Sequence, residues 1–280
     1  MRSVLVTAAS GNAGRHVVSA LLSKGLRVIA TSRQPQNLAV PDLIETRAYD
    51  ADALTDFDRL LEGVDDVVLI GPPLDGKVHE KLAPLIAAIS ARKSMHLVYL
   101  SGNYLGGFSG SSLASLAIRK VELQIIQSGL RYTLVRAGFF MDNFLSGFYA
   151  PMVNQGRLSL AVGDSRSAFV AAADVGEFIA EALSQSLTGE YLVTGPEALD
   201  HFEVAALLSR KLDRVISYDP ITQDQLKALY VSKGLPAETI EYGLTLYGAV
   251  RNHATAAITD SFKQATLRNP QSFEEFLELA

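Results

Sequence analysis

Apolar and polar positions follow two rhythms along the first half of the chain. Short runs rich in β-branched residues predict buried strands, and apolar residues that recur every three or four positions predict amphipathic helices. Strands are expected at Ser3–Thr7, Arg27–Thr31, Ile44–Tyr49, Asp66–Ile70, Leu97–Leu100 and Thr133–Val135. Helices are expected at Asn12–Lys24, Leu54–Leu61, Val78–Ala91 and Ser115–Gln127. This alternation predicts an α/β fold with a doubly wound parallel sheet, because parallel strands need right-handed crossovers.

The alternation weakens after about Leu145. Helices are expected at Ala173–Ser184, His201–Lys211, Thr222–Lys233, Ala237–Val250 and Ser272–Leu279, with a single strand at Glu190–Thr194. We interpret this part as a smaller, mostly helical carboxy-terminal lobe. The predicted division is a Rossmann-type domain over residues 1–150 and a lobe over 151–280 that is interleaved with it.

Composition narrows the class of protein. Of the 280 residues, 48% are hydrophobic and 20% charged, so a sizeable core is available and wholesale disorder is excluded. The formal net charge of −5 argues against a general affinity for nucleic acid. The chain has no cysteine, which excludes disulfides, thiolate metal sites and a cysteine nucleophile. Its five histidines are scattered, so no metal site is expected.

Two further features concern location. No apolar stretch is long enough to predict a membrane span. The apolar run at the amino terminus is too short for the core of a signal peptide. A soluble, cytoplasmic protein is therefore expected.

A turn of small residues separates the first predicted strand from the first helix. It reads Ala8-Ala9-Ser10-Gly11-Asn12-Ala13-Gly14. Small residues let the backbone approach a pyrophosphate, and the free N–H groups of the helix start favour negative charge. In this position the turn predicts dinucleotide binding. The alternative is a tight strand–helix turn without a ligand.

Arg33 follows the second predicted strand, where an NAD-selective site normally has a carboxylate that binds the ribose hydroxyls. Asp and Glu are absent from Ala30 to Val40. The guanidinium suits the 2′-phosphate of NADP by charge and by its planar set of donors. The sequence thus favours NADP(H) as the cofactor, and a solvated loop arginine is the alternative.

The chain resembles the NmrA-like group of atypical short-chain dehydrogenases/reductases, of the quinone-oxidoreductase and triphenylmethane-reductase type. The resemblance runs essentially from end to end. The matching stretches are residues 6–14, 128–136, 138–143, 168–170, 174–175, 191–195 and 268–273.

This resemblance implies positions for the cofactor. Pyrophosphate would lie on Ser10, Gly11, Asn12 and Ala13, and the adenosine phosphate on Arg33. The loop with Gly71 and Pro72 would pass the ribose beside the nicotinamide. Ser101, Gly102, Gly138, Phe139 and Phe140 would flank the nicotinamide ring, so that a larger residue at position 138 should block the cofactor without disturbing the fold.

The resemblance also implies an acceptor pocket. Tyr104, Asn143 and Phe144 are the predicted substrate contacts, together with the two phenylalanines beside the nicotinamide. The alternatives are that the aromatic residues are simply core and that Asn143 holds a backbone loop. For Asp174, a structural hydrogen bond or a helix cap is expected.

Two departures from the family pattern bear on activity. Family members usually have glycine where this chain has Ala8. None of the ten tyrosines is followed four residues later by lysine, so the Tyr-x-x-x-Lys proton relay is missing, and its positions would fall at Ala114 and Ile118.

A quinone accepts hydride readily without that relay. We therefore expect an NADPH-dependent oxidoreductase that transfers a hydride to a quinone or similar planar acceptor. The alternative is a non-catalytic, NADP(H)-binding redox sensor that acts through a regulatory protein partner. The sequence is also compatible with a homodimer.

Overall fold

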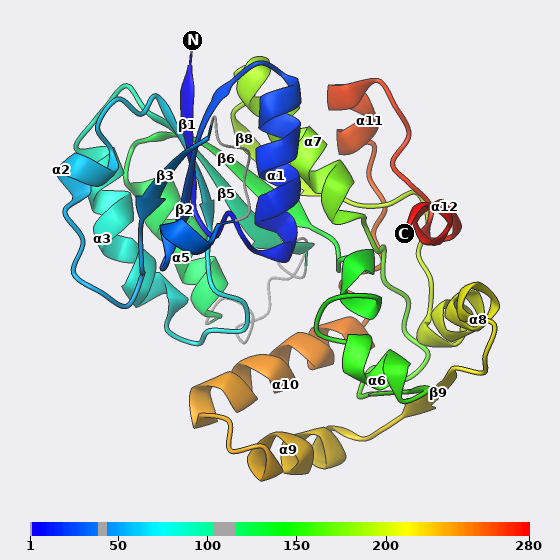
Figure 1. Cartoon of the computed structure of the whole chain (residues 1–280). Helices are drawn as coiled ribbons and strands as arrows, with labels where there is room; N and C mark the ends of the chain where they lie inside the picture. Colours follow the sequence, from blue (N-terminus) through cyan, green and yellow to red (C-terminus); the bar gives the residue numbers. More distant parts are fainter. Residues whose placement is uncertain (1, 39–43, 104–115) are drawn as a thin grey trace.

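The computed structural model describes residues 2–38, 44–103 and 116–280. Seven strands form its main sheet, in the order β3-β2-β1-β4-β5-β6-β8, and every neighbouring pair is parallel (Figure 1). The strands are β1 (Ser3–Val6), β2 (Arg27–Ser32), β3 (Glu45–Ala48), β4 (Asp66–Ile70), β5 (His96–Gly102), β6 (Arg131–Ala137) and β8 (Gly189–Val193). This topology confirms the predicted doubly wound sheet.

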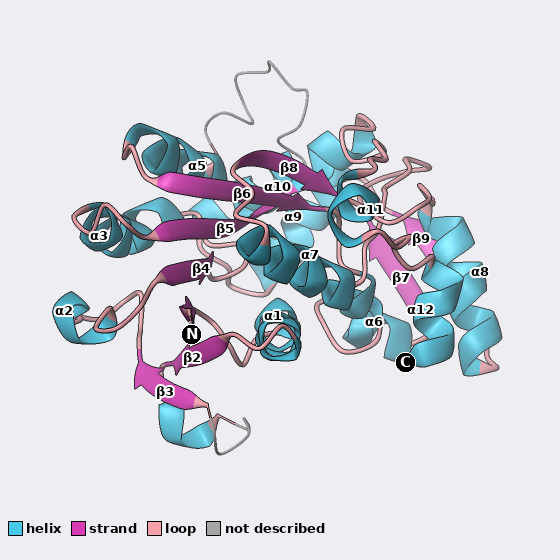
Figure 2. Ribbon diagram, turned by 90° about the horizontal axis from the view of Figure 1, so that it is seen from above, coloured by secondary structure: helices cyan, strands magenta, loops and turns pink. Residues whose placement is uncertain are grey.

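Helices cover both faces of the sheet (Figure 2). On one face α1 (Asn12–Ser23) packs against α7 (Ala172–Ser184), and on the other α3 (Val78–Ser90) packs against α5 (Ala117–Gln127). The strands between them are buried on both sides, and all of β1 is inaccessible or nearly so. The apolar runs that predicted the strands are explained by this double burial.

The predicted helix at Leu54–Leu61 is shorter in the structure. It is α2 (Phe57–Leu60), and its start is set by Asp56, whose carboxylate accepts hydrogen bonds from the backbone N–H groups of Asp58 and Arg59. A side-chain cap of this kind satisfies donors that have no partner inside the helix.

The lobe contains more structure than the sequence predicted. Its elements are η3 (Met141–Phe144), α6 (Ala150–Asn154), β7 (Arg157–Leu160), α8 (His201–Leu212), β9 (Ser217–Pro220), α9 (Gln223–Ser232), α10 (Ala237–Arg251) and α12 (Phe273–Leu279). Strands β7 and β9 pair in parallel as a small second sheet that was not predicted. The lobe has its own apolar core around Phe144, Phe169 and Phe273.

Two elements predicted for the lobe belong to the main layer instead. Helix α7 buries Val175, Phe178 and Ile179 in the same core as α1, and β8 extends the sheet beyond β6. The reason is physical: α7 is apolar along a broad face, and that face packs against α1 and the sheet. The chain therefore enters the lobe after β6, returns for α7 and β8, and leaves again. The boundary at residue 150 stays a prediction.

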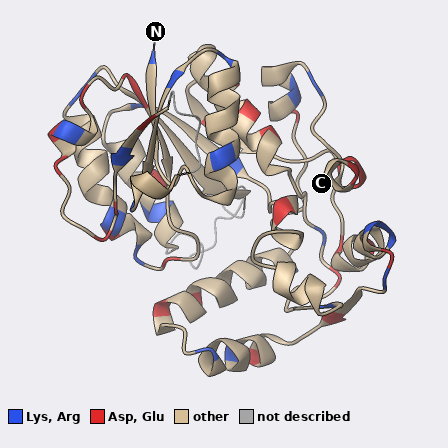
Figure 3. Cartoon of the chain, viewed as in Figure 1, with Lys and Arg blue, Asp and Glu red and all other residues tan. Residues whose placement is uncertain are grey.

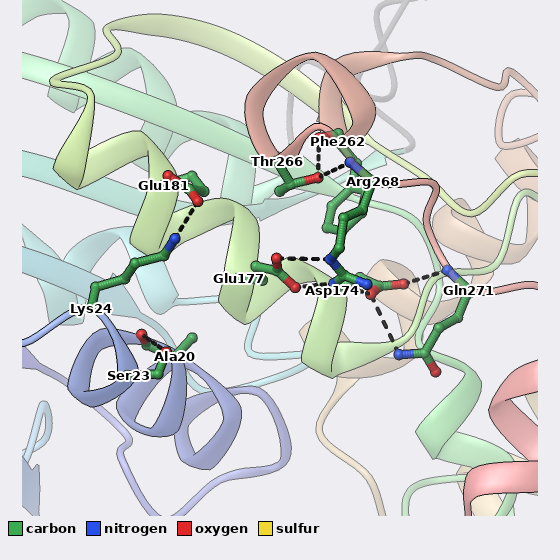
Figure 4. Close-up of polar contacts among 10 residues, drawn as sticks. All are labelled: Ala20, Ser23, Lys24, Asp174, Glu177, Glu181, Phe262, Thr266, Arg268 and Gln271. Carbon is green, nitrogen blue, oxygen red and sulfur yellow. Dashed lines mark hydrogen bonds and ion pairs between the residues drawn. The ribbon is translucent and has the colours of Figure 1, made fainter.

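Helix α7 is joined to the segment that follows α11 (Ser261–Thr266), as Figure 4 shows. The buried carboxylate of Asp174 accepts a hydrogen bond of 2.8 Å from the backbone N–H of Gln271, and Arg268 pairs with Glu177. Burial raises the pKa of Asp174 to about 6. This is the structural hydrogen bond expected for Asp174; the helix cap of α7 is Ala171.

In the part of the chain that the structure describes, no helix combines the length and apolar character needed to cross a membrane. The same residues contain no group of three or more His, Cys, Asp or Glu side chains placed to hold a metal ion.

Candidate functional site

A cavity of about 1020 Å³ lies where β1, β4, β5 and β6 end, between the sheet and helices α9 and α10. Ligands of open α/β sheets bind at these carboxyl ends, where the strand order reverses, which here is between β1 and β4. The sheet wall consists of Ala8, residues 11–14, 70–75, 99–103 and 137–140. The lobe wall consists of Asn143, residues 147–149, Tyr230, Leu235 and much of α10.

The lobe wall is mostly uncharged. Helix α10 carries acidic residues near its start and Arg251 at its end, with no charge between Glu241 and Arg251 (Figure 3). Leu235, Tyr242 and Leu246 present apolar or aromatic surface to the cavity. A wall of this kind suits a planar, uncharged ligand.

The small-residue turn has the geometry of an anion cradle. A Cβ at Gly14 would lie 2.1 Å from the carbonyl oxygen of Ala8, so only glycine fits there. Gly11 caps α1, and its N–H donates to the Ala8 carbonyl at 2.9 Å. The side-chain nitrogen of Asn12 is buried and has no hydrogen-bond partner among the residues that the structure describes. An unsatisfied N–H donor at a helix start, on a cavity wall, fits the pyrophosphate of a dinucleotide.

Ala8 adopts the left-handed backbone conformation, with φ of +49°. Glycine reaches this region at no steric cost, whereas an L-residue is strained there. This explains physically why a glycine is usual at this position, and why the alanine is a departure that affects the turn itself.

Most predicted cofactor contacts line the cavity. They are Gly11, Asn12, Ala13, Gly71, Pro72, Ser101, Gly102, Gly138, Phe139 and Phe140. Ser10 and Arg33 are exposed and lie outside its lining. Within residues 2–38, 44–103 and 116–280, Arg33 makes no hydrogen bond or ion pair, so its guanidinium is available to a ligand. The assignment of each residue to the cofactor stays a prediction.

Gly138 has a packing role that the sequence did not reveal. A Cβ there would lie 2.2 Å from the backbone oxygen of Ala168. The segment after β6 is held against this backbone, since Val170 N–H donates to the Phe139 carbonyl at 3.0 Å. A larger residue at position 138 would therefore disturb the fold, and the expectation that it would only block the cofactor is wrong.

The predicted substrate contacts separate in the structure. Asn143 lines the cavity, and its backbone carbonyl accepts a hydrogen bond of 2.8 Å from the backbone N–H of Tyr149. Phe144 is fully buried in the aromatic core of the lobe and is not on the cavity wall, so the core alternative describes it. Tyr104 lies outside the described residues.

A buried ionic network supports the end of β5. The hydroxyl of Ser101 donates to Glu122 at 2.6 Å, and Arg136 donates to both oxygens of the same carboxylate at 3.0 and 2.7 Å. Arg119 also pairs with the fully buried Glu122, and Glu190 pairs with Arg136, so two arginines face two glutamates. Sequence reasoning missed this network; a glutamate beside Val121 on the apolar face of the predicted helix was the available signal.

Three tyrosines of the lobe wall were also missed. Tyr149, Tyr230 and Tyr247 all line the cavity, and the hydroxyls of Tyr149 and Tyr247 are 3.1 Å apart. They come from three separate elements, so no local motif marked them.

The strand order, the small-residue turn and the cavity at the switch point define a protein of the Rossmann-type α/β class. Within that class, the chain belongs to the NmrA-like family, which matches residues 1–277. The resemblance seen in the sequence is thus confirmed.

Among the similar proteins are enzymes whose names include NAD(P)H or NADPH. The chain is 28% identical to an NAD(P)H azoreductase of Xenophilus azovorans, covering 98% of this chain and 96% of the relative. It is 27% identical to prestalk A differentiation protein A of Dictyostelium discoideum, covering 98% and 91%. An NADPH-dependent quinone oxidoreductase of Escherichia coli, solved with NADPH, has a TM-score of 0.82 at 20% identity, covering 99% of both chains.

Proposed function

We propose that this protein is an NADPH-dependent oxidoreductase that transfers a hydride to a quinone or a similar planar acceptor. The observation that carries the proposal is the cavity itself. It joins the anion cradle at the start of α1 to a mostly uncharged lobe wall that carries several aromatic side chains. A cofactor and a flat acceptor can therefore lie against each other.

The residues present fit a bound NADP(H). The Gly11–Gly14 turn would hold the pyrophosphate, and Arg33, without a protein partner among the described residues, would bind the 2′-phosphate. The cofactor would supply the hydride. The azoreductase relative and the NADPH complex of the similar quinone oxidoreductase support this choice.

The chain's own contribution to catalysis would be positioning. Without a Tyr-x-x-x-Lys pair, the chain lacks the usual proton relay, which favours an acceptor whose reduced form is protonated by water. Holding two reactants face to face in a site that excludes water supplies much of a rate enhancement. The comparisons give no support to the alternative of a non-catalytic regulator.

The experiment follows the loss of NADPH absorbance with a panel of quinones, for the wild type and Asn12→Asp. The variant is nearly isosteric but places a negative charge beside the pyrophosphate. We expect KM for NADPH to rise about tenfold or more, since like charges a few ångströms apart repel by about 1–4 kcal/mol.

Stability provides the control for this variant. An acidic residue in the first turn of a helix is favourable, so the melting temperature of the cofactor-free variant should be equal to or above that of the wild type. Reduction of no quinone above the uncatalysed rate would refute the proposed activity. Turnover with an unchanged KM in Asn12→Asp would place the cofactor elsewhere.

A further inference from the structure

Three tyrosine side chains converge on the lobe wall of the cavity. Tyr149 precedes α6, Tyr230 lies on α9 and Tyr247 on α10. Each residue is only 5% exposed, and all three line the cavity. The hydroxyls of Tyr149 and Tyr247 are 3.1 Å apart, and Tyr230 interacts with Tyr247 as well. We call these residues the tyrosine cluster.

The cluster has more donors than its internal hydrogen bonds use. Three phenol groups carry three O–H donors, and the two contacts among them use two at most. Within the described residues, these hydroxyls have no other hydrogen-bond partner. At least one O–H donor is therefore left over on the cavity wall, where an oxygen atom of a ligand can accept its hydrogen bond.

The backbone of α10 is shaped to hold one of these rings. A Cβ at Gly243 would lie 2.6 Å from Cε2 of Tyr230 and 3.3 Å from its hydroxyl oxygen. The ring of Tyr230 therefore packs directly against the backbone of α10. A side chain at position 243 would clash with the ring in this position. Close packing of the ring therefore fixes the position of the Tyr230 hydroxyl group.

The phenols remain protonated at neutral pH. Burial raises the pKa of Tyr149 to about 12, raises that of Tyr230, and raises that of Tyr247 well above its usual value. The cluster can donate hydrogen bonds to a ligand, but it does not release protons to it.

We propose that the tyrosine cluster is an oxygen-binding subsite at the lobe end of the acceptor pocket. The acceptor is then a planar, aromatic or quinonoid molecule with two polar ends: one reacts at the sheet wall, and the other carries a carbonyl or hydroxyl oxygen that accepts a hydrogen bond from the cluster. Its role as hydride acceptor rests on the proposed function, whereas binding to the cluster needs no turnover.

The test measures binding of 2-naphthol and naphthalene, which differ by one oxygen, by equilibrium dialysis with and without saturating NADP⁺. The proteins are the wild type, the triple variant Tyr149→Phe/Tyr230→Phe/Tyr247→Phe, which removes every hydroxyl of the cluster, and Tyr218→Phe. Tyr218 is the matched control: it is a buried tyrosine of the lobe whose hydroxyl donates to the Gly163 carbonyl at 2.7 Å, and it does not line the cavity.

We expect the preference of the protein for 2-naphthol over naphthalene to fall about 2- to 12-fold in the triple variant, the effect of one neutral hydrogen bond. Naphthalene binding and the Tyr218→Phe ratio should match the wild type. An unchanged ratio in the triple variant, or an equal loss in Tyr218→Phe, would overturn the proposal. A preference that depends on the cluster in a protein that reduces no quinone would uphold the subsite and refute only the proposed activity.

Discussion

Replacing Ala8 by glycine should stabilise the protein. Ala8 lies in the turn before α1 with φ of +49°, and its carbonyl is held in place by the N–H of Gly11 at 2.9 Å. The alanine cannot relax to a better conformation without breaking this turn, because the same carbonyl also faces Gly14 at close range. The strain is therefore present in the folded state only.

The size of the effect follows from two opposing contributions. A left-handed conformation costs an L-residue about 1–2 kcal/mol relative to glycine. Glycine, in turn, makes the unfolded chain more flexible, which lowers stability by about 0.4–1 kcal/mol. We expect Ala8→Gly to raise the free energy of unfolding by about 0.5–1 kcal/mol, or the melting temperature by about 1–2 °C.

Ser186→Gly is the matched control. Ser186 also has a positive φ, of +56°, but it is exposed in the turn between α7 and β8, far from the cavity lining. Both variants should gain stability in denaturant titrations without cofactor. Only Ala8→Gly should lower the dissociation constant for NADPH, because Ala8 lies on the cavity wall. Loss of stability in Ala8→Gly would refute the account of strain. Equal changes in NADPH affinity in Ala8→Gly and Ser186→Gly would show that position 8 has no particular effect on cofactor binding.

Two further predictions concern charge. Arg33→Ala should weaken NADPH binding about 10- to 150-fold and leave NADH nearly unchanged, since a charge-assisted hydrogen bond contributes about 1.5–3 kcal/mol and NADH lacks the 2′-phosphate. Fluorescence titration of both cofactors checks this, and a parallel loss of both would remove Arg33 from this role. Asp174 has a folded pKa of about 6, above its ordinary value of 3.8, because it is buried. The folded state then binds more protons than the unfolded state between about pH 4 and 6, so this group makes stability fall as pH rises through that window. Asp174→Asn should reduce this fall, and thermal unfolding from pH 4 to 7 that is identical in both proteins would contradict the pKa assignment.

The main sheet was predictable because its strands lie buried on both faces. Such strands read as apolar runs, and Ser3–Thr7 and Asp66–Ile70 match β1 and β4 closely. The start of β5 was missed because it is His96, a polar residue, whose Nε2 lies 2.8 Å from the hydroxyl of Thr133 inside the core. A pattern of hydrophobicity alone does not show such a pairing.

The second sheet was hidden for a different reason. Strands β7 and β9 are short, and sixty residues separate their paired positions, Arg157 and Ser217. Proline is unfavourable inside a strand because it has no N–H donor, and in β9 it is the last residue, Pro220. Their pairing depends on tertiary packing, which leaves little trace in the local sequence.

The functional site, too, could be predicted from the sequence only in part. The turn at Ala8–Gly14 is contiguous, so its small residues and its place between the first strand and the first helix predicted an anion site. Glu122 and the tyrosine cluster depend on residues from separate elements that meet only in the folded chain. Phe144 shows the converse: adjacent to Asn143 in sequence, it points into the lobe core rather than the cavity.

The return of the chain to the sheet has a consequence during synthesis. Strand β6 ends at Ala137, but its outer neighbour β8 begins only at Gly189, after the chain has made part of the lobe. Until then the nascent chain presents an apolar strand with an open row of backbone donors and acceptors. Such an edge is a template for pairing with another chain, so the interval between β6 and β8 is the stage at which aggregation is most probable. On the ribosome, at 5–20 residues per second, that interval lasts roughly 3–10 seconds.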